Sequence, residues 1–179
     1  MTNEPNELRT FSVLVEDVPG VLNRIASLFR RRDFNILSLN VGGTHEAGVS
    51  RMTVVVAADE RTGRLIEANL YKLVNVLAVE DITERASVTR HLALIRVAAD
   101  AEQRATIREI CEMFRAKVVD VAHDSLMIEI AGTTEKIEGL FRLLSPFGIK
   151  EMVQTGAVAL TRGAGVPSAR TERASREAA

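Results

Sequence analysis

Hydrophobic positions near the start of the chain follow first a period of two and then a helical period. In residues 8–15, β-forming apolar side chains alternate with other side chains, which is typical of a strand with one buried face. Beyond Pro19 and Gly20, apolar residues return every three or four positions between 21 and 29, which predicts an amphipathic helix. Burying its apolar face would contribute on the order of 10 kcal/mol before entropy, so we expect this helix to pack on a sheet.

Strand and helix patterns continue along the rest of the chain. Strands are predicted at 35–41 and 49–57 around a glycine-containing hairpin, followed by a helical stripe over 65–74 and a strand at 76–83. The second half repeats this order, with elements at 91–98, 107–114, 118–121, 126–130, 137–144 and 149–153, the last of which could extend to 160. The order β-α-β-β-α-β therefore occurs twice.

This repeated order predicts an α+β fold of two tandem ferredoxin-like βαββαβ domains, each with its helices on one face of an antiparallel sheet. We expect residues 7–84 to form the first domain and residues 89–162 the second. The repeat is one of pattern and not of residue identity. Residues 163–179 carry charges without an apolar stripe, which predicts a disordered tail.

The composition is that of a globular protein without an obvious charged partner. Of 179 residues, 46% are hydrophobic and 26% charged, and the net charge is −1, so neither nucleic acid nor an anionic membrane is favoured as a partner. No apolar run approaches the roughly 18 residues of a membrane span. The single Cys111 falls in an apolar helical pattern, which indicates a buried, reduced thiol. We therefore expect a cytoplasmic protein.

Common catalytic and cofactor-binding motifs are missing from the sequence. It contains no phosphate-binding loop, no Gly-x-Ser-x-Gly turn and no Gly-x-Gly-x-x-Gly. The histidines, His45, His91 and His123, lie tens of residues apart without a metal-ligand spacing, so we expect them at the surface. Acidic neighbours such as Glu80 and Asp81 would point to opposite faces of a strand. We expect no catalytic residue, metal or cofactor on this chain.

One loop, from Glu16 to Leu22, has features of a ligand site, because it leaves a strand and enters a helix. Pro19 has a fixed φ suited to a helix start, and Gly20 allows close approach of a small ligand. The first N–H groups of the helix are then free to bind a carboxylate. The same residues are also compatible with a plain turn whose N–H groups are hydrated.

At this loop the sequence resembles the small regulatory subunit of acetolactate synthase, also called acetohydroxyacid synthase. Residues 11–25 resemble the opening strand, ligand loop and helix of an ACT domain, and residues 33–41 and 50–53 resemble this family in particular. Shorter matches follow at 73–76, 131–133 and 156–163. The resemblance therefore runs from Leu8 to Gly163 and implies an N-terminal ACT domain followed by a C-terminal ACT-like domain.

The resemblance implies a non-catalytic regulatory subunit. It would activate the catalytic large subunit and confer feedback inhibition by valine, or a related branched-chain amino acid, on the first common step of valine, leucine and isoleucine biosynthesis. It further implies a homodimer paired edge to edge through the N-terminal ACT domains. Thiamine diphosphate, magnesium and FAD are then expected on the catalytic partner.

The resemblance also implies which residues bind the effector, by their position in the family pattern. Loop and helix-start residues would hold the charged groups of the amino acid and part of its side chain, and two residues of the second subunit would close the pocket. These residues are Asp17, Val18, Pro19, Gly20, Val21 and Leu22, with Asn35 and Ile36 from the second subunit.

Three other functions stay open on the sequence. The chain could be a stand-alone ACT-type sensor without an enzyme partner, although its second domain counts against this. It could be an enzyme on a ferredoxin-like scaffold, whose acid, base or nucleophile would have to be assembled from distant residues. It could also be an oligomerisation module whose sheet edges pair and whose loop binds nothing.

Overall fold

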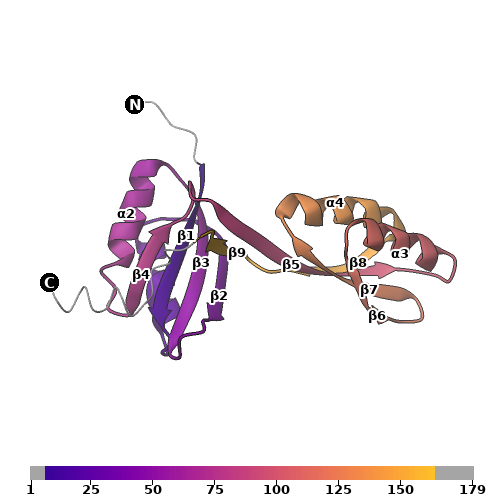
Figure 1. The fold of residues 1–179 in the computed structure, drawn as a ribbon, viewed down its shortest axis with the longest axis horizontal. Coiled ribbons are helices and arrows are strands. Elements are labelled where there is room, and N and C mark those ends of the chain that lie inside the picture. Colours follow the sequence, from indigo (N-terminus) through magenta and orange to yellow (C-terminus); the bar gives the residue numbers. More distant parts are fainter. Residues whose placement is uncertain (1–6, 164–179) are drawn as a thin grey trace. The chain divides into compact units, whose positions relative to one another are not determined.

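The computed structural model describes residues 7–163, which divide into two compact units (Figure 1). One unit contains residues 7–88 and 157–163, and the other contains residues 89–156. Each has the element order β-α-β-β-α-β and an antiparallel sheet. The predicted α+β fold with two βαββαβ domains is therefore confirmed.

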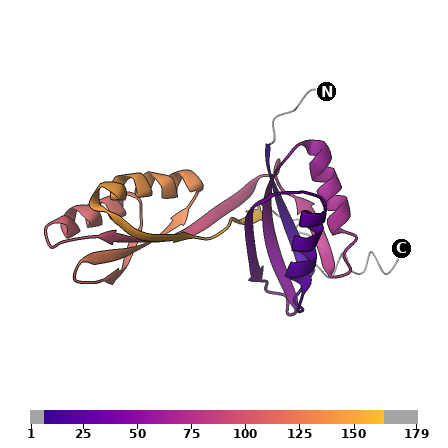
Figure 2. The same cartoon turned by 180° about the vertical axis from the view of Figure 1, so that it is seen from behind.

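The first unit is a four-stranded sheet of order β2-β3-β1-β4 with two helices. Its elements are β1 (Glu7–Glu16), α1 (Val21–Arg31), β2 (Ile36–Gly43), β3 (Val49–Ala58), α2 (Glu60–Leu70), β4 (Val76–Asp81) and β9 (Val158–Thr161). Figure 2 shows both helices against the same face of this sheet. The core lies between them: Phe11 and Val13 of β1 pack with Ile25 of α1 and Ile66 of α2, and all four are at most 1% exposed.

The second unit repeats the arrangement with the sheet order β6-β7-β5-β8. Its elements are β5 (Ser87–Ala98), α3 (Gln103–Met113), β6 (Lys117–Val121), β7 (Ser125–Gly132), α4 (Thr134–Leu144), a 3-10 turn (Ser145–Phe147) and β8 (Ile149–Gln154). Ile95, Ile128, Ile107 and Ile137 form a separate core, each at most 1% exposed. Cys111 is buried in the same core as a free thiol, as the sequence predicts.

The end of the chain differs from the sequence prediction. β8 ends at Gln154 instead of extending to 160, and the next strand, β9, belongs to the first unit and pairs with β5. Just before β9, the Ala157 N–H donates to Ser38 Oγ of β2 at 3.0 Å. Ala157 and Ala159 are at most 3% exposed. The sequence predicts residues 157–162 in the second domain, whereas their contacts group them with the first unit; small alanines give no sign in the sequence of which sheet they cover. The predicted tail, apart from Gly163, lies outside the described residues.

The second helix of the first unit also differs from its predicted bounds. It begins at Glu60, because Asp59 Oδ1 accepts a hydrogen bond from the Thr62 N–H at 2.7 Å and caps the helix. It ends at Leu70, so Val74, which the apolar stripe included, lies beyond the helix and is 87% exposed. A hydrophobic stripe alone predicts the helix but not its ends.

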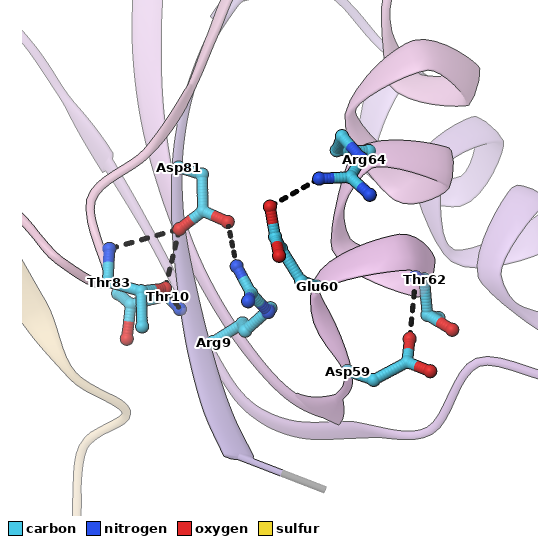
Figure 3. A network of polar contacts seen from close by, with 8 residues as sticks. All are labelled: Arg9, Thr10, Asp59, Glu60, Thr62, Arg64, Asp81 and Thr83. Atoms are coloured by element: carbon cyan, nitrogen blue, oxygen red, sulfur yellow. Dashed lines mark hydrogen bonds and ion pairs between the residues drawn. The ribbon is translucent and has the colours of Figure 1, made fainter. Parts of the chain in front are cut away.

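A polar network joins β1 and β4 at one end of the first sheet, beside α2 (Figure 3). Arg9 of β1 has a side chain only 11% exposed and donates from Nη1 to Asp81 Oδ2 of β4 at 2.9 Å. Asp81 Oδ1 accepts from the Thr83 N–H at 3.0 Å. A Cβ at Gly63 would lie 2.8 Å from Arg9 Cδ, so glycine is what lets α2 approach this arginine.

Candidate functional site

The candidate effector loop connects the end of β1 to the start of α1. Gly20 is the N-cap of α1 and has φ 86° and ψ −6°, a left-handed conformation that costs glycine little and other residues more. A Cβ at Gly20 would meet no heavy atom of residues 7–163 within 4 Å. The requirement for glycine therefore comes from the backbone conformation and leaves open space in front of the helix.

The first turn of α1 has unused hydrogen-bond donors. Within the described part of the chain no side chain caps this helix, and its first turn contains no acidic residue. The Val21 N–H reaches the Val18 carbonyl at 3.4 Å, whereas within residues 7–163 the N–H groups of Leu22 and Asn23 donate to no protein acceptor. Free N–H groups and the helix dipole together favour an anion at this end. The local chemistry suits a carboxylate.

Neighbouring segments hold the loop in place. The Asp17 N–H donates to the Gly48 carbonyl at 2.8 Å, and the Glu16 N–H donates to the Asn75 carbonyl at 2.9 Å. Asn75 Nδ2 also donates to Glu16 Oε2 at 2.7 Å, and Asn75 Oδ1 accepts from Arg24. The loop is therefore ordered before any ligand binds, which lowers the entropy cost of binding.

Sequence reasoning did not include Asn75 and Arg24 in the site. Asn75 lies between α2 and β4, about 55 residues after the loop, and only the pairing of β4 with β1 brings it there. Arg24, one turn into α1, is exposed and adds a positive charge beside the loop. A carboxylate in front of α1 would benefit from that charge.

The predicted site residues differ in what they offer a ligand. Asp17, Pro19 and Gly20 are exposed, and Val18 and Leu22 are 45% and 47% exposed, so a ligand can reach all five. Val21 is 5% exposed and belongs to the core. Its side chain therefore supports the loop from beneath, and Val18 and Leu22 are the apolar groups at its surface.

Asn35 and Ile36 are not beside the loop in a single chain. They follow α1, whose eleven residues separate them from Gly20 by about 16 Å at about 1.5 Å per residue. Asn35 is exposed and Ile36 half-buried. Within one chain the candidate site is therefore the loop and helix start alone.

The other candidate chemical groups are dispersed. Residues 7–163 contain no group of three or more histidine, cysteine or acidic residues that could hold a metal ion. His45 has a side chain 92% exposed, and burial raises the pKa of the Cys111 thiol to about 11, which disfavours a nucleophilic thiolate. In the same range, every helix is too short or too polar to cross a bilayer.

Comparison with known proteins gives the same result for both units. Residues 11–78 match the AHAS small subunit-like ACT domain, and residues 90–163 match the family described as the small subunit of acetolactate synthase. The acetolactate synthase small subunit of Mycolicibacterium smegmatis is 53% identical over 154 residues, which cover 86% of this chain and 91% of that protein. The probable small subunit of Archaeoglobus fulgidus is 48% identical and is covered to 96%.

A solved structure agrees with these relatives. The crystal structure of the acetolactate synthase small subunit from Thermotoga maritima superposes with a TM-score of 0.82 at 38% identity, covering 88% of this chain and 98% of that one. Sequence similarity therefore extends over nearly the whole length of these proteins and coincides with the same fold. The chain belongs to the family of acetolactate synthase small subunits.

Proposed function

We propose that this chain is the regulatory subunit of an acetolactate synthase: it binds the catalytic large subunit, raises its activity, and withdraws that support when valine or a related branched-chain amino acid binds. Family membership supports the choice of enzyme. The observation that carries the effector site is the N-terminus of α1, where within residues 7–163 no side chain caps the helix and the N–H groups of Leu22 and Asn23 donate to no acceptor, beside a loop held by hydrogen bonds.

The sheet register supports a site shared between two copies. The candidate loop follows Glu16, which pairs with Val49, and Gly43 at the end of β2 pairs with Ser50 at the same end of the sheet. Ile36, at the start of β2, pairs with Val56 at the other end. β2 is an edge strand, and antiparallel pairing of two β2 edges about a twofold axis puts the start of one β2 beside the end of the other.

Such pairing completes the pocket that one chain leaves open. It brings Asn35 and Ile36 of a second copy toward the loop of the first, where Val18 and Leu22 are already exposed. The amino acid's carboxylate binds the helix N-terminus, and its ammonium group pairs with Asp17. The apolar side chains enclose the branched aliphatic group, although one methylene changes the affinity by only about 1–3 kcal/mol.

Valine acts in this proposal by favouring one of two arrangements of the dimer. A ligand shifts an equilibrium only through its different affinities for the two states. A coupling of about 1–3 kcal/mol would change the response of the catalytic subunit by about 5- to 150-fold. Thiamine diphosphate, magnesium and FAD belong to the catalytic partner, which carries out the reaction.

The test is acetolactate formation by the cognate catalytic subunit, with and without this chain, across a valine titration. We expect activation that valine reverses. Gly20→Asp places a carboxylate in front of α1 and should weaken the valine response by about 10- to 100-fold, the effect of losing one charge-assisted contact. Gly163→Asp is the matched control, because Gly163 also has a positive φ, of 85°, but belongs neither to the loop nor to α1.

Each outcome bears on a different part of the proposal. Activation without any valine response would leave the regulatory role but refute the effector site. Equal loss of response in Gly20→Asp and Gly163→Asp would also count against the loop. If the chain has no effect on the catalytic subunit at any ratio, the regulatory role is wrong, and a free-standing amino-acid sensor becomes the better account.

A further inference from the structure

A cavity lies on the face of the first sheet that α1 and α2 leave open. Core side chains such as Leu39 of β2 face the helices, so its neighbour Ser38, which accepts the hydrogen bond from β9, faces away from them. β9 therefore lies on the face opposite α1 and α2 (Figure 1). Beside it is a cavity of about 490 Å³, which we name the open-face pocket.

The walls of the open-face pocket are largely apolar. Leu14 of β1, Val49 of β3, and Val158 and Leu160 of β9 line it. Its volume falls within the range of roughly 300–1,000 Å³ that is usual for small-molecule sites. None of the residues from Asp17 to Leu22 lines it, so it is distinct from the candidate effector loop.

Arg51 supplies a positive charge to the open-face pocket. Its side chain donates from Nη1 to Ser12 Oγ at 2.9 Å, and Ser12 is only 5% exposed. Among residues 7–163 Arg51 forms no ion pair. A guanidinium has five donors in a planar fork that matches a carboxylate. One bond to a serine holds the arginine and leaves most of its donors available to a ligand.

Glu46 supplies the opposite charge on the same cavity. Its side chain is 19% exposed, and His45 Nε2 lies 4.0 Å from its Oε1. Thr44 fixes the backbone here, because Thr44 Oγ1 accepts from the Glu46 N–H at 3.1 Å and donates to the Val49 carbonyl at 2.9 Å. A carboxylate on a held backbone segment and a guanidinium held by Ser12 therefore line the same cavity.

We propose that the open-face pocket is a second amino-acid site, complete within one chain, that binds a small aliphatic α-amino acid. The ligand's carboxylate pairs with Arg51, its ammonium group pairs with Glu46, and its side chain packs on Leu14, Val49 and Leu160. A zwitterion compensates both protein charges at once, which neither a simple carboxylate nor an amine does. Because β9 forms one wall, occupancy stabilises this strand on the sheet.

The test uses the isolated full chain with ¹³C-labelled valine and leucine methyl groups and two probes of the same carbon skeleton, valine and 3-methyl-2-oxobutanoate. We expect valine to shift the methyl resonances of Val49, Val158 and Leu160 saturably, and the oxo acid, which lacks the ammonium group, to bind more weakly. If neither probe moves these resonances at millimolar concentration, the site does not exist. Equal affinity for both probes would refute an amino-acid site.

Two variants assign the charges. Arg51→Gln should weaken both probes by about 10- to 100-fold, the effect of one charge-assisted contact. Glu46→Gln should weaken valine to a similar extent and leave the oxo acid unchanged. Arg64→Gln is the control, because its exposed side chain pairs with Glu60 on α2. Unchanged valine binding in both pocket variants would overturn the proposal.

A further variant separates this site from the effector loop. In Gly20→Asp the methyl shifts of Val158 and Leu160 should persist, because neither residue contributes to the loop. Loss of those shifts in Gly20→Asp would assign them to the loop and refute a second site. The measurement needs no catalytic subunit, so it stands whether or not the chain regulates acetolactate synthase.

Discussion

Two separate cores should give two unfolding transitions, and truncation of one core should affect only one of them. Ile66 of α2 is 0% exposed in the first core, and Ile137 of α4 is 1% exposed in the second. Replacing a buried isoleucine by alanine costs about 2–5 kcal/mol, because apolar contacts are lost and a cavity remains. For units of this size each kcal/mol of lost unfolding free energy lowers the thermal unfolding midpoint by about 4–8 °C. We therefore expect the affected transition to fall by at least about 8 °C.

Hydrogen exchange followed by mass spectrometry of the intact chain locates each effect. Ile66→Ala should accelerate exchange in β1 and β3 but not in β7, and Ile137→Ala should do the reverse, because each unit opens with its own free energy. Val74→Ala, at a side chain 87% exposed, should change neither. If Ile66→Ala accelerates both units equally, the chain unfolds as one cooperative body and the reasoning from separate cores is wrong.

Three further predictions test individual side chains. Burial raises the pKa of the Cys111 thiol to about 11, so only about one thiol in a thousand is ionised at pH 8. An alkylating reagent should therefore label Cys111 only after the chain is unfolded in urea. Rapid labelling of the folded chain would contradict this. The pKa of Glu67 is raised by burial and by the charge of Asp81, so ionisation of Glu67 destabilises the fold as the pH rises above the ordinary carboxyl pKa of 4.5. Glu67→Gln should therefore raise the melting temperature at pH 7 and not at pH 4. An equal rise in melting temperature at both pH values would show that ionisation of Glu67 is not the cause. Tyr71 OH donates to the Val79 carbonyl at 2.9 Å and accepts its N–H at 3.1 Å, so Tyr71→Phe should cost about 1–3 kcal/mol in urea unfolding; no loss would show that water replaces the hydroxyl.

The sequence predicts the regular elements well where one periodicity dominates. The strand at the start of the chain and α1 follow directly from alternation and from the helical stripe, because each has one face in the first core. The predicted end of α2 was wrong, because Val74 continues the apolar spacing although its side chain is solvent-exposed and lies beyond the helix. Apolar spacing reports which residues can be buried and does not fix where backbone hydrogen bonds stop.

The candidate site was predictable only in its local part. Pro19 and Gly20 in a strand-to-helix turn identify the loop, and Gly20 does adopt the positive φ that the loop requires. Asn75 and Arg51 could not be found this way, because their roles depend on strand pairing and on a cavity between distant segments. Periodicity carries no information about which distant segments meet.

The path of the chain has a consequence for its synthesis. The chain leaves the first unit after residue 88 and returns at 157, so the second unit is an insertion of about 70 residues within the first. A ribosome adds about 5–20 residues per second, so β9 is synthesised about 3–14 s after the strands of the first sheet. During that interval the hydroxyl of Ser38 lacks the Ala157 N–H, and the face that β9 will cover is open to chaperones or to another nascent chain. The second unit, whose residues are contiguous, can finish folding first.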